Sequence, residues 1–215
     1  MKIEYNEQNE IEMPISANLD RNIEVLESLF ADWGDIVKKR FRLERESQRV
    51  DMYILYIDGL ADNEMVERTI TRPLLYEWRQ TKEIDFDKLF HNQTEAVDLV
   101  EETQMMEAVS AVLKGDTAIF VDGSERAMVL STKKFPTRAV SEPDKESGLK
   151  GPKDSFNENF RIDTALLRRR IKDPKMKLKQ GMLGQRSRTV YGLMYMEDLV
   201  YPSLLQEIQK KLDGF

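Results

Sequence analysis

A strand, turn, strand and helix pattern occurs twice in this 215-residue chain and constrains its fold most strongly. Residues 56–60 (YIDGL) resemble residues 195–199 (YMEDL). Each segment follows a basic strand, a polar turn and an apolar strand, and each precedes a helical pattern. The repetition predicts an α/β fold made of two similar small subdomains with mixed sheets. Duplication of the unit and independent reuse of a common α/β unit both explain it.

The repeat units lie toward the two ends, so we expect a division of the chain between them. Residues 1–17 are polar and acidic without periodicity and are expected to form a flexible tail. The N-terminal subdomain is expected to span 18–118 and the C-terminal subdomain 119–215. Within the first, the longest helical pattern covers 95–113. Residues 141–157 are rich in proline, glycine and serine and are expected to form a loop.

The remaining elements follow from hydrophobic periodicity, capping residues and turn signals. Helices are expected near residues 20–30, 61–78, 158–171 and 202–212. Strands are expected near residues 36–43, 50–57, 117–121, 127–130, 175–183 and 188–196.

The charge is distributed unevenly along the chain. The whole sequence holds 33 Lys and Arg against 39 Asp and Glu, a net charge of −6. This balance disfavours nonspecific binding to nucleic acid or to an anionic membrane. Residues 144–215 are nevertheless net basic and residues 1–143 strongly acidic. No apolar run is long enough to span a bilayer and no signal peptide is visible, so we expect the chain as given to be soluble.

Most catalytic chemistries lack their residues in this sequence. There is no cysteine, and the single histidine, His91, excludes a multi-histidine metal site. The glycine-rich phosphate-binding motifs are absent. Asp116 and Asp122 flank a predicted strand and could meet Mg²⁺, although aspartate beside glycine is also typical of turns. We expect no enzyme activity, no cofactor and no metal site, with a metal enzyme using these two aspartates as the minor alternative.

The sequence has one basic cluster, formed by Arg168, Arg169, Arg170 and the lysines that follow. Helical spacing places Arg169 within an apolar stripe and leaves Arg168 clear of it. A partly buried guanidinium needs a carboxylate or carbonyl partner. We therefore hypothesise that Arg169 or Arg170 pins the 141–157 loop to its helix. Nucleic-acid binding by this cluster is disfavoured because no aromatic residue is interleaved with the charges.

Short motifs between residues 111 and 171 carry a family resemblance. They are Gly115-Asp116-Thr117, Asp122-Gly123, Arg138, Glu142-Pro143, Gly151-Pro152, Phe156-Asn157-Glu158 and the Leu167 to Ile171 segment LRRRI. In these motifs the chain resembles the GerA spore germination family, the A subunits of nutrient germinant receptors, from about residue 24 to the end. The family has Arg and Gly where this chain has Lys153 and Ser155.

The resemblance implies that the chain is an N-terminal soluble domain of a protein that continues past Phe215 into membrane helices. It implies a place on the cytoplasmic, spore-core side of the spore inner membrane. The implied partners are a transporter-like B subunit and a lipoprotein C subunit. It further implies that the A subunits form a homo-oligomeric ion channel whose opening starts germination.

Two functions are consistent with these expectations. The first is a domain for nutrient sensing, receptor assembly and signal transmission, in which the packing of two lobes changes. Its expected inter-lobe residues are Gly151, Pro152, Phe156, Glu158, Arg168 and Arg170. The second is a binding module that holds an amino acid or another small polar nutrient in a cleft between lobes. Its expected ligand-binding residues are Arg138, Asp154, Asn157 and Arg169.

Overall fold

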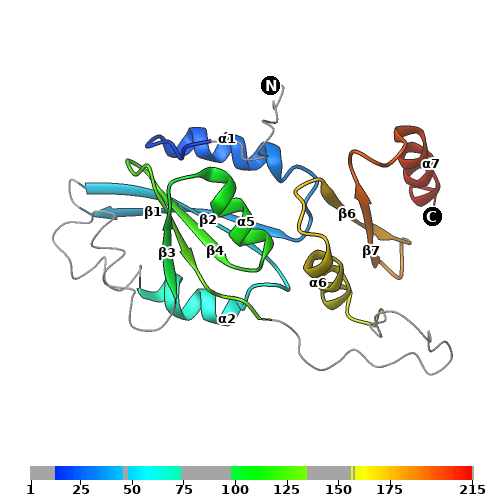
Figure 1. Ribbon diagram of the computed structural model, residues 1–215. Coiled ribbons are helices and arrows are strands. Elements are labelled where there is room, and N and C mark those ends of the chain that lie inside the picture. The colour runs from blue at the N-terminus through cyan, green and yellow to red at the C-terminus, as the bar shows by residue number, and fades with distance from the viewer. Residues whose placement is uncertain (1–12, 46–47, 74–97, 135–155, 157, 215) are drawn as a thin grey trace, which may run out of the picture.

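The computed structural model describes residues 13–45, 48–73, 98–134, 156 and 158–214. These residues form two lobes that lie side by side (Figure 1). The N-terminal lobe is built on a five-stranded sheet and the C-terminal lobe on a two-stranded sheet. The α/β class is therefore confirmed.

The sheet of the N-terminal lobe has the strand order β1-β2-β4-β5-β3, and every neighbouring pair is antiparallel. Its strands are β1 (Ile36–Arg45), β2 (Gln48–Ile57), β3 (Leu99–Glu102), β4 (Thr117–Val121) and β5 (Ala127–Leu130). Valine, isoleucine and aromatic residues favour these strands, and β4 and β5 are buried along their whole length.

Successive side chains of β2 enter different cores because strand residues alternate between the two faces of a sheet. Tyr53, Leu55 and Ile57 pack with α1 (Leu19–Leu29) and α5 (Met105–Leu113). Met52 and Ile54 pack on the other face with residues from α2 (Asn63–Val66) and from the π-helical segment η1 (Glu67–Thr71). Helices thus cover both faces of the sheet.

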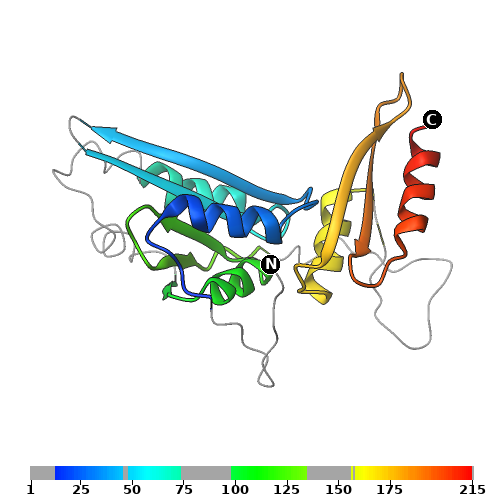
Figure 2. The ribbon, with the colours of Figure 1, turned by 90° about the horizontal axis from the view of Figure 1, so that it is seen from above.

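The C-terminal lobe contains α6 (Phe160–Arg170), β6 (Met176–Leu183), β7 (Thr189–Met196) and α7 (Pro202–Leu212). The strands β6 and β7 are antiparallel and lie between α6 and α7 (Figure 2). Phe160 of α6 occupies the space that a side chain at Gly192 of β7 would fill. On the opposite face, Gln209 of α7 donates a hydrogen bond to the hydroxyl of Tyr191. The strand, turn, strand and helix unit predicted twice from the sequence is present in both lobes.

A short backbone pairing joins the two lobes. The segment before β1 lies beside β6, with a parallel bridge between Trp33 and Leu178. The Gly34 amide donates to the Leu178 carbonyl at 2.9 Å, and the Leu178 amide donates to the Asp32 carbonyl at 2.8 Å. The start of the first strand is therefore held directly against the C-terminal lobe.

The structure differs from the sequence expectations near residue 100. A single helix over 95–113 was expected, but β3 precedes α5 in the part of this segment that the structure describes. Glu101 and Glu102 pair with Met128 and Ala127 along the edge of β5. The helical pattern of residues 95–113 gives no information on β5 as a pairing partner. Pairing with β5 therefore overrides the local helical preference of residues 99–102.

The expected division of the chain also differs from the observed sheets. A boundary between residues 118 and 119 falls inside β4, and both β4 and β5 pair in the same sheet as β1 and β2. The sheets are antiparallel where mixed sheets were expected, and the two lobes differ in size. Residues 13–17 belong to the fold: Ile15 is buried, and its amide donates to the Thr103 carbonyl. Residues 1–12 lie outside the described residues.

Among the described segments, no helix is both long and apolar enough to cross a bilayer.

Candidate functional site between the lobes

Five of the ten residues expected to bind a ligand or to lie between the lobes fall outside the described residues. Arg138, Gly151, Pro152, Asp154 and Asn157 lie outside the described residues, so their roles stay predictions. Phe156 and Glu158 are described and both are exposed. The cluster at the end of α6 is fully described.

Arg168 is the buried arginine of this cluster. Its side chain is 1% exposed, and that of Asp35 is 0% exposed. The Nε and Nη2 atoms of Arg168 each donate to one carboxylate oxygen of Asp35 at 2.8 Å. Its Nη1 donates to the Met176 carbonyl, and its guanidinium carbon lies 3.4 Å from the centre of the Trp33 ring. The guanidinium therefore has both a charge partner and a flat surface to stack on.

The expectation that Arg169 is partly buried is wrong, because Arg169 and Arg170 are exposed. The face of α6 that meets the N-terminal lobe carries residues 161, 165 and 168, which follow one another at helical spacing. The apolar residues of α6 did not predict its buried face, because Arg168, paired with Asp35, occupies a buried position on that face. The hypothesis that Arg169 or Arg170 pins residues 141–157 concerns a segment outside the described residues.

The Trp33 side chain further secures the junction around Arg168. Its indole N–H donates to the Pro174 carbonyl at 2.9 Å, and its ring meets Phe30 edge to face with centroids 4.9 Å apart. The Lys177 ammonium, also buried, donates to the Leu29 carbonyl at 3.2 Å, close to the end of α1. Polar groups of both lobes are thus paired across the junction, as buried polar groups require.

Arg161 makes a second contact between the lobes, two turns earlier on α6. Its Nε lies 3.0 Å from Oδ2 of Asp58, whose Oδ1 accepts a hydrogen bond from Asn63 at 3.0 Å. Gly59 has a φ of +92°, and a Cβ atom there would lie 3.1 Å from the Arg161 carbonyl and 3.5 Å from the Ala165 Cβ. Glycine therefore permits both the turn and the close approach of α6.

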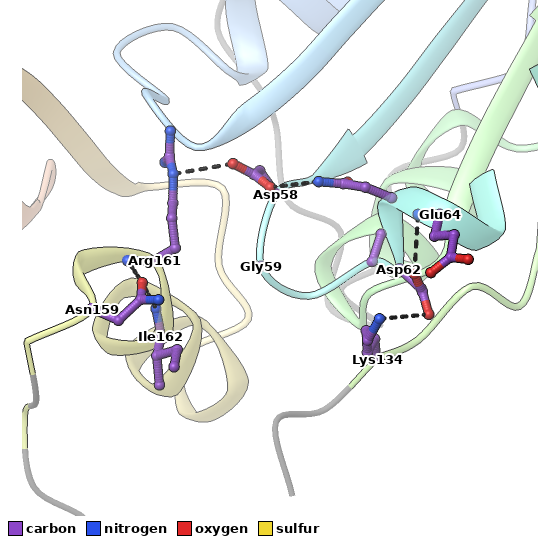
Figure 3. A pocket seen from close by; sticks show the side chains of 10 residues that line it. Asp58, Gly59, Asp62, Glu64, Lys134, Asn159, Arg161 and Ile162 are labelled. Carbon is purple, nitrogen blue, oxygen red and sulfur yellow. Dashed lines mark hydrogen bonds and ion pairs between the residues drawn. The ribbon is translucent and has the colours of Figure 1, made fainter. Parts of the chain in front are cut away.

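A pocket of about 620 Å³ opens beside this second contact (Figure 3). It lies between the turn that follows β2 and the first turn of α6. Its lining residues are Asp58, Gly59, Ala61, Asp62, Asn63, Glu64, Lys134, Asn159, Arg161 and Ile162.

Opposite charges are paired along the pocket wall. Figure 3 shows Arg161 directed toward Asp58 and Lys134 directed toward Asp62. The Lys134 ammonium lies 3.0 Å from Oδ2 of Asp62, and its hydrogen bond lowers the pKa of that carboxyl. Oδ1 of Asp62 caps α2 by accepting from the amides of Glu64 and Met65. Side chains of both charges therefore line this pocket as ion pairs.

The structure does not bring Asp116 and Asp122 together. They flank β4 at opposite ends, with Asp116 3.0 Å from the Lys133 ammonium and Asp122 accepting from the Leu19 amide at 3.1 Å. Within the ranges that the structure describes, no group of three His, Cys, Asp or Glu side chains is arranged to hold a metal ion.

Sequence reasoning did not identify Asp35, Asp58 or Arg161 as site residues. In the sequence, Asp58 and Gly59 stand out only as part of the repeated segment 56–60. The spacing of Arg161, Ala165 and Arg168 was the available signal, because it places two arginines and a small residue on one helix face. Asp35 gave no signal, since its partner lies 133 positions away.

The fold and the junction define a two-lobed α/β domain whose lobes are held together by arginine–aspartate pairs, with an open pocket beside one of these pairs. The family model for the Bacillus/Clostridium GerA spore germination protein matches residues 24–215, and the chain belongs to this family.

Named relatives support the same assignment. Over 206 residues the chain is 29% identical to spore germination protein B1 of Bacillus subtilis, covering 93% of this chain and 41% of that protein. Over 181 residues it is 30% identical to stage V sporulation protein AF of the same species, covering 82% of this chain and 35% of that protein. The uncharacterized membrane protein YfkQ of B. subtilis is 28% identical over 93% of this chain and 38% of its own length. The chain thus spans about two fifths of the length of these three relatives.

A solved structure has the same fold. It is the crystal structure of the N-terminal domain of the A subunit of the Bacillus megaterium spore germinant receptor GerK3. The TM-score is 0.74 at 21% sequence identity, and the match covers 94% of this chain and 74% of that one. This likeness establishes the fold shared by the two domains.

Proposed function

We propose that this chain is the N-terminal soluble domain of a spore germinant receptor A subunit, where it acts in nutrient sensing, receptor assembly and signal transmission. Membership of the GerA family and the fold shared with the GerK3 domain support this proposal. The junction around Arg168 carries the transmission step. It holds the two lobes in a defined arrangement, and a change in that arrangement is a signal that another part of a receptor can read.

The proposal includes a location and a set of partners. The domain works on the spore-core side of the spore inner membrane, attached to a membrane region that lies outside this chain. It assembles with further A subunits and with B and C subunits of the receptor into an ion-conducting complex. It performs no enzymatic reaction of its own.

The receptor role is tested in spores of the source organism. The full-length gene is deleted in a strain that lacks its other nutrient receptors, and germination is measured with and without the restored gene. The proposal predicts that nutrient-triggered germination requires the restored gene, and that the B and C subunits co-purify with its product. Equal germination in both strains contradicts the receptor role.

The pocket supports a second candidate function, binding of a small polar nutrient such as an amino acid. The paired charges of Asp58 with Arg161 and of Asp62 with Lys134 offer groups of both signs to a zwitterion. Titration of the isotope-labelled chain with pooled amino acids and sugars, followed by two-dimensional amide NMR, tests this function. Saturable shifts of the Gly59, Asn63 and Ile162 amides that disappear in Arg161→Ala support it. Absence of shifts at millimolar ligand places nutrient binding elsewhere in the receptor.

A further inference from the structure

Helix α6 meets the N-terminal lobe through two ion pairs on one face. Arg161 and Arg168 are seven residues apart, about two helical turns, and therefore point to the same side of the helix. Their partners Asp58 and Asp35 are neighbours as well, because Asp58 follows β2, Asp35 precedes β1 and the two strands pair antiparallel. The Asp58 amide donates to the Asp35 carbonyl at 2.8 Å. One end of the sheet thus holds one helix at two points.

The two points differ strongly in burial. At the first, the side chains of Arg168 and Asp35 are 1% and 0% exposed. At the second, those of Arg161 and Asp58 are 38% and 28% exposed. An exposed ion pair contributes little and is screened by salt, whereas separating a buried pair leaves uncompensated charges away from water. The Arg161 contact therefore breaks far more readily.

Neighbouring contacts increase this difference. Beside Arg168, the pairing of Leu178 with the Asp32–Gly34 backbone also joins the lobes. At the other point, the Nη1 atom of Arg161 is covered but has no hydrogen-bond partner among the described residues. Returning that N–H to water relieves the cost of leaving a covered donor unpaired. The closed arrangement at Arg161 thus carries a cost that opening removes.

We propose that α6 is a lever with one permanent and one releasable attachment: the C-terminal lobe pivots about Arg168 and Asp35 when Arg161 and Asp58 separate. The pocket lies on the releasable side, since Arg161 and Asp58 both line it. A polar ligand that binds either side chain competes with their ion pair and so changes the angle between the lobes. This inference rests on the proposed function in one respect, namely that the lobes transmit a signal by relative motion.

The absence of cysteine from the chain makes the motion directly measurable. Arg68→Cys on η1 and Ser203→Cys on α7 place spin labels at exposed positions in the two lobes. Pulsed electron paramagnetic resonance then gives the distribution of distances between the labels. We expect Arg161→Ala to raise the ratio of open to closed molecules by about two- to fivefold, the range expected from loss of an exposed ion pair.

A matched control lies within the N-terminal lobe. Arg126 and Glu101 are 35% and 30% exposed and 2.8 Å apart, which closely resembles the Arg161–Asp58 pair. Arg126→Ala is expected to leave the distances unchanged. Raising the salt concentration should open the wild-type chain and have much less effect on Arg161→Ala. If Arg161→Ala fails to fold, Asp58→Asn and the salt titration of the wild-type chain provide the same test.

Unchanged distances in Arg161→Ala, or an equal change in Arg126→Ala, overturn the lever. The measurement uses the chain without nutrient or other subunits. A negative result therefore removes the lever and leaves the receptor function to be decided by the germination experiment.

Discussion

Asp35 and Arg168 lie 133 positions apart in the sequence and form a buried ion pair with two hydrogen bonds of 2.8 Å. The pair joins the start of the first strand of one lobe to the last turns of the first helix of the other. Burying two charges costs free energy that their attraction only partly returns, so such a pair contributes more to a defined geometry than to stability. Its position is the main reason to assign the junction a role in transmission.

Removing one partner of this pair is expected to be severely destabilising. Asp35→Ala and Arg168→Ala should each lower the free energy of unfolding by about 3–5 kcal/mol, because each leaves a buried charge unpaired. The double variant should lose clearly less than the sum of the two single losses. Urea unfolding followed by circular dichroism measures all three. Additive losses would show that the two side chains do not interact, and Arg126→Ala serves as a control with an expected loss below about 1 kcal/mol.

A second prediction concerns the acid sensitivity of the hairpin formed by β1 and β2. Hydrogen bonds from Arg42, and then from Arg49 and Arg40, hold the pKa of Asp51 well below its usual range. In the unfolded chain this carboxyl has a pKa of ~3.9. The depressed folded pKa therefore contributes stability that is present above about pH 4 and is lost as the pH falls below it.

Asp51→Asn tests this effect. The variant should be less stable than the wild type at pH 7, and its unfolding free energy should fall less between about pH 5 and pH 2. Asp20→Asn is the control, because Asp20 is exposed and its ion pair is with Arg40, which is also exposed. Parallel pH profiles for the wild type and Asp51→Asn would contradict the assignment.

Substitutions at two glycines distinguish the cost of backbone strain from the cost of crowding against α6. Gly59 and Gly123 both have positive φ, at +92° and +86°, but a Cβ atom at Gly59 would meet α6 whereas one at Gly123 would meet nothing within 4 Å. Gly123→Ala should lower the free energy of unfolding by about 1 kcal/mol from strain alone, and Gly59→Ala by about 2–3 kcal/mol. Chemical denaturation measures both. Equal losses of unfolding free energy in the two variants would contradict the close packing of α6 against the turn at Gly59.

Local features of the fold could be predicted well from the sequence. Asn18 caps α1 by accepting from the Arg21 amide, and Pro202 lies in the first turn of α7, as their residue types indicate. The strand β2 is visible in the sequence as a continuous apolar run, because both of its faces are buried in a core. For the starts of α1 and α7, the deciding residues lie within a few positions of the helix.

The features that sequence reasoning missed depend on distant partners. The strand β3 forms because it pairs with the second edge of β5. Arg168 is buried because Asp35 accepts its hydrogen bonds and its guanidinium stacks on the Trp33 ring. The pocket arises where the turn after β2 meets the start of α6, about 100 residues later in the chain. The hydrophobic periodicity of a single segment cannot predict a contact with a segment so distant in the sequence.

Charge reversal at the Arg161–Asp58 contact tests the account most directly in a working receptor. Spores carry full-length Arg161→Asp, Asp58→Arg or both changes, with receptor amounts matched by immunoblot, and the nutrient concentration for half-maximal germination is measured. The account predicts that each single change shifts this concentration at least about twofold, since loss of the ion pair alters the open population by that factor. The double reversal, which restores an ion pair, should return it toward the wild-type value. Single variants that germinate like the wild type at equal receptor amounts would contradict signal transmission through the contact between the lobes.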